Sequence, residues 1–312
     1  MENKEKNFAS SIIYVHNAEK RIEEFFGTII NVMENNFEHS EIICVNDCSE
    51  DRSVEMIKKI SEKATSTSVS VVNMSHFHGL ELAMDAGMDL SIGDFVFEFD
   101  NTVLDFEPEM IMKVYSHSLE GFDIVSASPD KKAKLTSSLF YKAFDRFSDV
   151  SYAMTTESFR VLSRRVINRI SSMNKTIPYR KAVYANSGLR TDNLKYQIKQ
   201  ISNDRLDKRE RKYRSGLATD TLILFTDLGY SFAKCMTVLM MLMSIFTVLY
   251  AVIIFVTGSP VEGWTTTVLF LSAAFFGLFG ILTIIIKYLQ LIVNLVFKRK
   301  HYNFESIEKL TK

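Results

Sequence analysis

The chain has few of the residues that mark disulfide scaffolds, zinc sites or nucleic-acid binders. Its 3 cysteines, Cys44, Cys48 and Cys235, show neither a metal-binding spacing nor an even disulfide framework, so we expect a reducing, cytoplasmic setting. The 37 basic and 37 acidic residues give a formal net charge of +0, which argues against nucleic acid as a partner. The charged start at residues 1–7 predicts no signal peptide.

Charge is absent from two long runs near the C-terminus. Residues 235–256 and 264–286 carry no charged side chain. Each run is about 22 residues long, which is enough to cross a bilayer core of about 30 Å, so together they predict a transmembrane hairpin. Lys234 precedes the first run and Lys287 follows the second, whereas the turn between them carries only Glu262. We therefore expect a multi-pass protein of the cell (inner) membrane, with the N-terminal region and both termini in the cytoplasm.

The segment before the hairpin is basic at first and then apolar. Residues 205–214 are rich in lysine and arginine, and residues 219–232 are largely apolar. The apolar part predicts a helix along the inner leaflet, with a plain linker helix as the alternative. The basic part is suited to contact anionic lipid or a phosphate-bearing lipid, or it is simply solvated. The chain thus divides into a cytoplasmic domain at 1–204, a basic segment with an interfacial helix at 205–233, a hairpin at 234–297 and a cytoplasmic tail at 298–312.

Strand-like and helix-like segments alternate in the first part of the chain. The predicted strands are residues 10–16, 41–47, 68–74, 94–100 and 122–128. Apolar residues spaced close to 3.6 apart follow the first strand, and Ser49 or Asp51 is a suitable N-cap for the second helix. This alternation predicts an α/β domain with a mostly parallel, Rossmann-like sheet and helices on both faces. Ligands of such sheets bind at the carboxyl ends of the strands.

The motifs at these strand exits resemble those of glycosyltransferase family 2. The sequence VNDCSEDRS at 45–53 is similar to the V-D-D-G-S-x-D-x-S loop of the family, and residues 78–101 are similar to its G-x-x-x-A-x-x-x-G…D stretch. Residues 158–167 match its F-R-L-x-x-R segment, and 298–302 match the tail of the branch that charges polyprenyl or dolichyl phosphate. The resemblance covers nearly the whole chain.

This resemblance implies a glycosyltransferase A-type nucleotide-binding domain and an inverting reaction. A sugar would pass from a UDP- or GDP-linked nucleotide-sugar to a polyprenyl phosphate, with Mg²⁺ or Mn²⁺ bound by a D-x-D motif. Glu19 and Asp47 would hold the nucleoside, and Gly79 would let backbone N–H groups approach an anion that His76 and His78 also contact. The alternatives are a helix-terminal charge for Glu19, a turn or cap for Asp47 and ordinary loop residues for the two histidines.

Asp100 is the sharpest candidate, because it ends an apolar strand where an unpaired carboxylate is unfavourable. It occupies the first position of D-x-D as a metal or ribose ligand, followed by Asn101 in the donor site. Thr102 replaces the second aspartate, as the other metal position, and Leu104 replaces a glutamine. Mg²⁺ often takes only one or two carboxylates, so Asp100 with Asp105 is a candidate metal and catalytic pair.

Cationic residues complete the expected site. A phosphate acceptor is already anionic, so catalysis rests on positioning and on stabilising the leaving diphosphate rather than on a strong base. Arg160 is the catalytic candidate, whereas Arg164, Lys212 and Tyr213 are candidates for the acceptor phosphate, since a guanidinium suits bidentate contact. Surface ion pairs are the alternative for the two arginines.

Two other functions stay open. A saccharide or lipid-linked glycan acceptor would need a base, for which Asp105, Glu107 and Glu157 are weak candidates. A catalytically degenerate membrane scaffold or nucleotide-sugar sensor would explain Thr102, Leu104 and Ser158. Thr102 and Ser158 stand where the family has acidic residues, and Leu104 stands where it has a glutamine. A homo-oligomer is possible for a membrane hairpin, and two uncharged runs offer no polar path for a pore.

Overall fold

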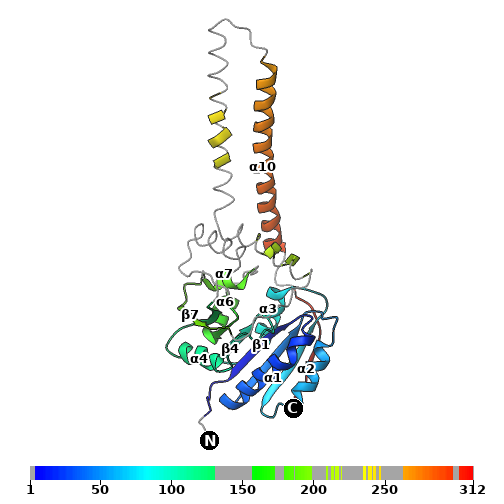
Figure 1. Ribbon diagram of the computed structural model, residues 1–312, viewed down its shortest axis with the longest axis vertical. Helices are drawn as coiled ribbons and strands as arrows, with labels where there is room; N and C mark the ends of the chain where they lie inside the picture. Colours follow the sequence, from blue (N-terminus) through cyan, green and yellow to red (C-terminus); the bar gives the residue numbers. More distant parts are fainter. Residues whose placement is uncertain are drawn as a thin grey trace.

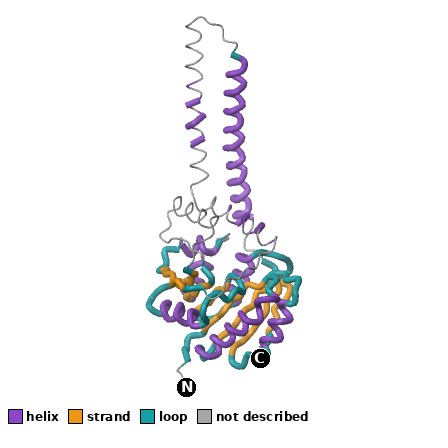
Figure 2. Tube along the Cα trace, in the orientation of Figure 1, coloured by secondary structure: helices purple, strands orange, loops and turns teal. Residues whose placement is uncertain are grey.

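The computed structural model describes residues 4–130, 157–172, 179–185, 187–198, 263–297 and 302–311, with single positions between 209 and 246. Figures 1 and 2 show an α/β domain from which one long helix projects. The first elements are β1 (Ala9–Val15), α1 (Glu19–Asn36), β2 (Ser40–Asn46), α2 (Ser53–Ser61), β3 (Thr67–Met74), α3 (Leu80–Leu90), β4 (Phe95–Phe99), α4 (Glu109–Ser118) and β5 (Ile124–Pro129). They are followed by β6 (Phe159–Ser163), α6 (Arg164–Ser172), α7 (Arg180–Ala185), β7 (Thr191–Tyr196), α10 (Trp264–Phe297) and β8 (Phe304–Lys309).

The described strands form one eight-stranded sheet in the order β7-β5-β6-β4-β1-β2-β3-β8. The pairs β1–β2, β1–β4, β2–β3 and β5–β7 are parallel, which confirms the predicted α/β class and mostly parallel sheet. β6 runs antiparallel to both β4 and β5. Its first residues therefore lie at the edge where β4 ends, so the start of β6 joins the carboxyl ends of the parallel strands.

Apolar side chains fill a core on each face of the sheet. On one face, α1, α2 and α4 cover the strands, and the periodic residues of α1, such as Phe25 and Ile29, are fully buried there. On the other face, α3, α6 and α7 pack on residues such as Ile12 and Val45. The spacing of apolar residues in α1 thus predicts both the helix and its buried face.

The start of α2 differs from the prediction. The cap position is Arg52, and no side chain bonds the helix terminus from that position. Asp51 instead lies one residue earlier, where its carboxylate accepts the backbone N–H groups of Ser53 at 3.0 Å and of Glu19 at 2.9 Å. Ser49 donates no cap either, because its hydroxyl accepts the N–H of Asn17 at 3.1 Å. The loop is therefore tied to the start of α1 rather than to α2 alone.

The segment at the C-terminus adds a strand that the sequence does not predict. Residues 298–312 are expected as a tail, yet β8 pairs antiparallel with β3 and closes that edge of the sheet. The hydroxyl of Thr311 also accepts the backbone N–H of Val69 at 2.7 Å. This short strand, FESIEK, mixes charged, polar and apolar residues without a strict alternation. Its pairing partner is more than 200 positions away, so no local signal marks it.

The long helix α10 contains the second apolar run and continues to Phe297. It extends away from the α/β domain in Figure 1, and the side chain of Met240, from the first apolar run, lies against its Gly277. The interfacial helix predicted at 219–232 and most of the first run lie outside the described residues. Among the residues that are described, no helix is both long and apolar enough to cross a membrane. The transmembrane hairpin stays a prediction.

Candidate active site

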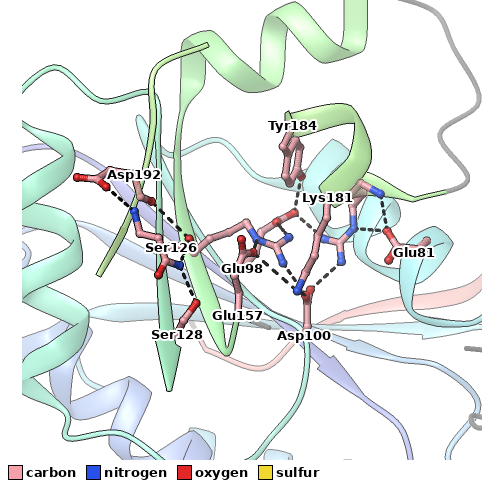
Figure 3. A network of polar contacts seen from close by, with 12 residues as sticks. Glu81, Glu98, Asp100, Ser126, Ser128, Glu157, Lys181, Tyr184 and Asp192 are labelled. Atoms are coloured by element: carbon pink, nitrogen blue, oxygen red, sulfur yellow. Dashed lines mark hydrogen bonds and ion pairs between the residues drawn. The ribbon is translucent and has the colours of Figure 1, made fainter. Parts of the chain in front are cut away.

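Buried charged side chains meet where β4 ends and β6 begins. Glu98 of β4 lies directly opposite Arg160 of β6 in the antiparallel register. Arg180, at the start of α7, reaches the same point from the helix above the sheet. Both arginines are almost inaccessible to solvent, and Glu98 is fully buried. Figure 3 shows Glu81 of α3, Glu98 and Asp100 at the end of β4, Glu157 before β6 and Lys181 of α7 converging here.

Glu98 is the centre of this buried ion network. One of its carboxylate oxygens accepts Nη1 of Arg160 at 2.7 Å. The other accepts Nη1 of Arg180 at 2.6 Å and the hydroxyl of Tyr184 at 3.0 Å. Because burial of an unpaired carboxylate is unfavourable, these three donors offset the cost of placing Glu98 inside the sheet.

Asp100 is held by the same two arginines. Its two oxygens accept Nη2 of Arg160 and Nη2 of Arg180, each at 2.7 Å. Arg160 also binds Glu157 through Nε at 3.0 Å, and Arg180 binds Glu81 through Nε at 2.9 Å. Both guanidinium groups therefore use all three of their nitrogens on carboxylates. Arg160 and Asp100, which are predicted to be catalytic, are thus brought together as an ion pair.

Lys181 is the loosest member of the network. Its Nζ lies 3.7 Å from Glu157 and 4.0 Å from Asp100, which is beyond hydrogen-bond distance. Its side chain is 14% exposed, compared with 1% for Arg160 and 2% for Arg180. Four carboxylates, those of Glu81, Glu98, Asp100 and Glu157, thus face three cationic side chains in the described part of the site.

The network fixes the charge state of its members. Burial alone would raise the pKa of Asp100, but Arg160, Arg180 and Lys181 outweigh it and hold this pKa well below the usual value. Burial would likewise lower the pKa of each arginine, but the surrounding carboxylates raise it instead. Asp100 is therefore ionised at every physiological pH, and its charge is neutralised by its neighbours.

A divalent metal, which the resemblance implies, does not fit these residues as they stand. Both oxygens of Asp100 already accept a guanidinium donor, and Thr102 is a buried neutral residue. Asp105 accepts the hydroxyl of Tyr196 at 2.7 Å instead of joining Asp100. Within the described ranges, no three histidine, cysteine, aspartate or glutamate side chains are grouped so that they could hold a metal ion. The expected pair of Asp100 with Thr102 or Asp105 is therefore not formed as a metal site.

Asp47, at the exit of β2, binds the backbone of the loop that precedes α3. It is fully buried and accepts the hydroxyl of Tyr14 at 3.0 Å. It also accepts the backbone N–H groups of His78 at 2.7 Å and Gly79 at 2.8 Å. The carboxylate therefore fixes the loop before α3, an arrangement that neither a base contact nor a helix cap describes. Contact with a nucleobase stays a prediction that this geometry does not support.

The two histidines of that loop contact each other and other residues of the chain. The ring of His78 stacks on that of His76 with 3.8 Å between the centroids. Nδ1 of His78 lies 2.6 Å from the carbonyl oxygen of His76, and Nε2 accepts the backbone N–H of Asn303 at 3.2 Å. Both ring nitrogens of His78 are thus engaged by backbone groups of the chain. The loop is instead joined to the residues just before β8.

A pocket of about 870 Å³ opens beside this loop, at the exits of β2 and β3. It is lined by Cys48, Glu50, Ser75, His76, Phe77, Arg209, Lys212, Tyr213, Gly216 and Leu217. Gly79 has φ of +83° and lies so close to the ring of Tyr213 that a Cβ at this position would overlap the ring. The hydroxyl of Tyr213 accepts the backbone N–H of Glu81 at 3.4 Å, and Glu81 in turn binds Arg180. The pocket and the ion network are thus linked through Glu81.

Two of the remaining predicted residues lie at the strand exits, and one lies at the opposite end of the sheet. Glu19 pairs with Arg52, at 2.9 Å to Nε, at the exits of β1 and β2. Asn101 accepts the backbone N–H of Val103 at 2.9 Å and shapes the turn after β4. Arg164 lies at the opposite end of β4, where its Nε donates to the carbonyl of Gly93 at 2.8 Å. The structure therefore does not bring Arg164 to the strand exits, and a role in binding the acceptor phosphate finds no support.

Sequence reasoning missed Glu81, Glu98, Arg180 and Lys181. For Glu98 a signal existed, because a charged residue inside the apolar run FVFEF needs a buried partner. The other three carry no such signal, because the partners of Arg180 lie 80 to 99 positions away in the chain.

Comparison with known proteins assigns the family. A family model described as glycosyl transferase family 2 matches residues 10–170. The chain belongs to glycosyl transferase family 2. This membership places it among the glycosyltransferases and confirms the resemblance in the sequence motifs.

Relatives of this glycosyltransferase include proteins from several bacteria. It is 29% identical over 187 residues to an uncharacterized glycosyltransferase from Synechocystis sp., and the aligned region covers 58% of each chain. It is 26% identical over 271 residues to the uncharacterized glycosyltransferase YkcC of Bacillus subtilis, covering 83% of this chain and 81% of the relative. Identity to a prophage bactoprenol glucosyl transferase homolog of Escherichia coli is 27% over 202 residues, 62% of this chain and 65% of the relative. The match thus spans less than two thirds of the Synechocystis and Escherichia coli relatives.

Solved structures of similar shape include a mannosyltransferase from Pyrobaculum calidifontis in complex with GDP-Man and Mn²⁺. That protein has a TM-score of 0.49 and 13% identity, with 74% of this chain and 64% of that chain covered. Glucosyl-3-phosphoglycerate synthase from Mycobacterium tuberculosis has a TM-score of 0.48 and 15% identity, with 70% and 78% covered.

Proposed function

We propose that this glycosyltransferase moves a sugar, with inversion, from a nucleotide-sugar to a polyprenyl phosphate at the cytoplasmic face of the cell membrane. The observation that carries the proposal is the pocket at the exits of β2 and β3, which Arg209 and Lys212 line. Its volume is within the range of about 300–1,000 Å³ that holds small-molecule ligands. Relatives named bactoprenol glucosyl transferase support a lipid phosphate as acceptor.

The chemistry requires little from a general base. A phosphate oxygen of the acceptor forms a bond to the anomeric carbon of the sugar, and the bond from that carbon to the diphosphate breaks. The nucleoside diphosphate leaves with the electron pair. Because the acceptor is anionic before it reacts, the protein contributes mainly by aligning the two phosphates and by lowering their mutual repulsion. Lys212 and Arg209, which line the pocket, are the groups that would hold the acceptor phosphate.

Membrane attachment is part of the same proposal. It rests on the two apolar runs in the sequence and on the side chains of α10. Several large apolar residues along this helix have more than two fifths of their surface exposed to solvent. Among them are Leu282 at 42%, Phe275 at 50% and Ile286 at 63%. A contiguous apolar surface of this length needs an apolar environment. The basic segment that lines the pocket lies on the N-terminal side of these runs, which would bring the pocket near the lipid headgroups.

The test is a transfer assay with the full-length protein in detergent. A panel of UDP- and GDP-linked sugars is incubated with or without polyprenyl phosphate, and the lipid fraction is analysed by mass spectrometry. We expect a glycosylated lipid phosphate with one donor. The Lys212→Gln variant should raise KM for the lipid by about tenfold or more, as expected for loss of a charge-assisted hydrogen bond.

Lys59→Gln, an exposed lysine on α2, is the matched control and should leave KM unchanged. Absence of lipid product across the whole panel would refute the proposal. Sugar transfer to a saccharide instead would favour the second acceptor class, for which Asp105, held by Tyr196, is a partly exposed base.

A further inference from the structure

We infer that Lys181 supplies the positive charge that faces the donor diphosphate, so that this chain binds its nucleotide-sugar without a divalent metal. This inference rests on the proposed function, because it concerns the donor of that reaction. It starts from Asp100, whose two oxygens each accept a guanidinium N–H at 2.7 Å. A cation that approached either oxygen would also approach Arg160, Arg180 and Lys181.

Repulsion from these three cations makes Asp100 a poor metal ligand. A divalent ion binds a carboxylate oxygen at about 2.0–2.2 Å and would stand near both guanidinium groups. The second position of the motif offers no compensating charge, because Thr102 is neutral and only 2% exposed. A diphosphate leaving group still needs positive charge beside it. In the described network both guanidinium groups are offset by carboxylates, so this charge has to come from a cation that those carboxylates do not hold tightly.

Lys181 is the member of the network that can provide this charge. Arg160 and Arg180 are buried, and each uses Nε and both Nη atoms on carboxylates. Toward the described residues, Nζ of Lys181 makes longer ion pairs, at 3.7 Å and 4.0 Å, so those partners do not fix its three N–H donors. It is also the most exposed of the three cations. A flexible ammonium on this side chain can turn to a phosphate oxygen while the arginines keep Asp100 neutralised.

The experiment measures binding of UDP and GDP to the full-length, detergent-solubilised protein by isothermal titration calorimetry. One titration contains EDTA and the other contains Mn²⁺. We expect one of the two nucleotides to bind in EDTA, with a Kd that changes by less than about twofold when Mn²⁺ replaces EDTA. Lys181→Gln should weaken that binding by about tenfold or more, as expected for loss of a hydrogen bond to a charged group.

Controls separate a binding role from a structural one. Lys113→Gln, an exposed lysine on α4, should bind like the wild type, and Lys181→Arg should recover most of the affinity because it keeps the charge. The melting temperature of Lys181→Gln in the absence of nucleotide should stay within a few degrees of the wild-type value, because its ion pairs, at 3.7 and 4.0 Å, are long. Titration of Mn²⁺ alone, followed by electron paramagnetic resonance, should show no saturable binding.

The outcomes distinguish this inference from the proposed function. Nucleotide binding that is lost in EDTA and restored by Mn²⁺ would overturn the inference while leaving the transferase reaction in place. Binding by Lys181→Gln equal to that of Lys113→Gln would overturn the assignment of Lys181. Failure of both nucleotides to bind under all conditions would defeat the proposed function together with the inference.

Discussion

Replacing Arg180 by methionine should strongly destabilise the α/β domain. Arg180 is 2% exposed and binds the carboxylates of Glu81, Glu98 and Asp100 at 2.9, 2.6 and 2.7 Å. Methionine fills much of the same space but leaves those carboxylates with fewer cationic partners in a buried site. Removing one partner of a buried ion pair destabilises a protein by about 3–5 kcal/mol, chiefly because the remaining charge is left uncompensated.

The expected shift in melting temperature follows from the size of the domain. One kcal/mol corresponds to about 2–4 °C for a domain of about 150–250 residues, so Arg180→Met should melt about 6–20 °C below the wild type. Circular dichroism of the full-length protein is the appropriate assay. Tryptophan emission is unsuitable, because the 1 tryptophan of the chain is Trp264, which lies at the start of α10.

A surface arginine provides the matched control. Arg52 pairs with Glu19, but its side chain is 73% exposed. Exposed ion pairs contribute about 0.2–1 kcal/mol, so Arg52→Met should lower the melting temperature by only a few degrees. Equal shifts for the two variants would refute the view that the buried network supports the sheet.

The pH dependence tests the same reasoning. The pKa of Asp100 is depressed in the folded protein, so its contribution to stability is present above the unfolded pKa of about 3.9 and is lost as the pH falls through the folded value. Without Arg180 that folded pKa rises, and protonation then relieves the uncompensated charge. The difference in melting temperature between wild type and Arg180→Met should therefore be largest near neutral pH and should narrow below about pH 5. A difference that stays constant with pH would contradict the electrostatic explanation.

Two further substitutions test other parts of the fold. Gly79→Ala should destabilise the protein by about 1–3 kcal/mol in chemical unfolding, because φ is +83° and the new Cβ overlaps a ring, whereas Gly27→Ala, inside α1 with open space around it, should stabilise it by about 0.5–1 kcal/mol. Equal effects would argue against strain at Gly79. The pKa of His117 is raised by its hydrogen bond to Asp192 and by Glu120, so its contribution is full at low pH and is lost as the pH rises through the folded pKa. His117→Gln should therefore lower the melting temperature at pH 5.5 more than at pH 8.5, and the reverse order would refute the pairing.

The first half of the sheet could be predicted because its signals are local. The run at 41–47 is apolar and is followed by a turn, and the structure places β2 at Ser40–Asn46. Helix α1 shows the same agreement, because one turn of a helix is short enough to be seen in the spacing of Ile22, Phe25 and Ile29. Such patterns depend only on neighbours along the chain.

The site was harder to predict because its contacts are not local. Asp100 was selected because it ends an apolar strand, and it does lie at the strand exits. Its partners, however, come from β6 and α7, and no pattern near residue 100 identifies them. The same limit applies to Asp47, whose loop position is evident but whose bonds to His78 and Gly79 depend on how β2 and β3 lie side by side. A motif thus locates these carboxylates and leaves their partners to the fold.

The strand order has a mechanical consequence for α10. β7 lies at one edge of the sheet and β8 at the other, and Tyr213, which lies between them in the chain, packs against Gly79 at the start of α3. The stretch that contains α10 is therefore attached to the domain on both sides, through Tyr213 before it and through β8 after it. A fusion that separates β8 from β3 would remove one of these two attachments. A fusion after residue 312 would instead extend from β8, the edge strand of the sheet.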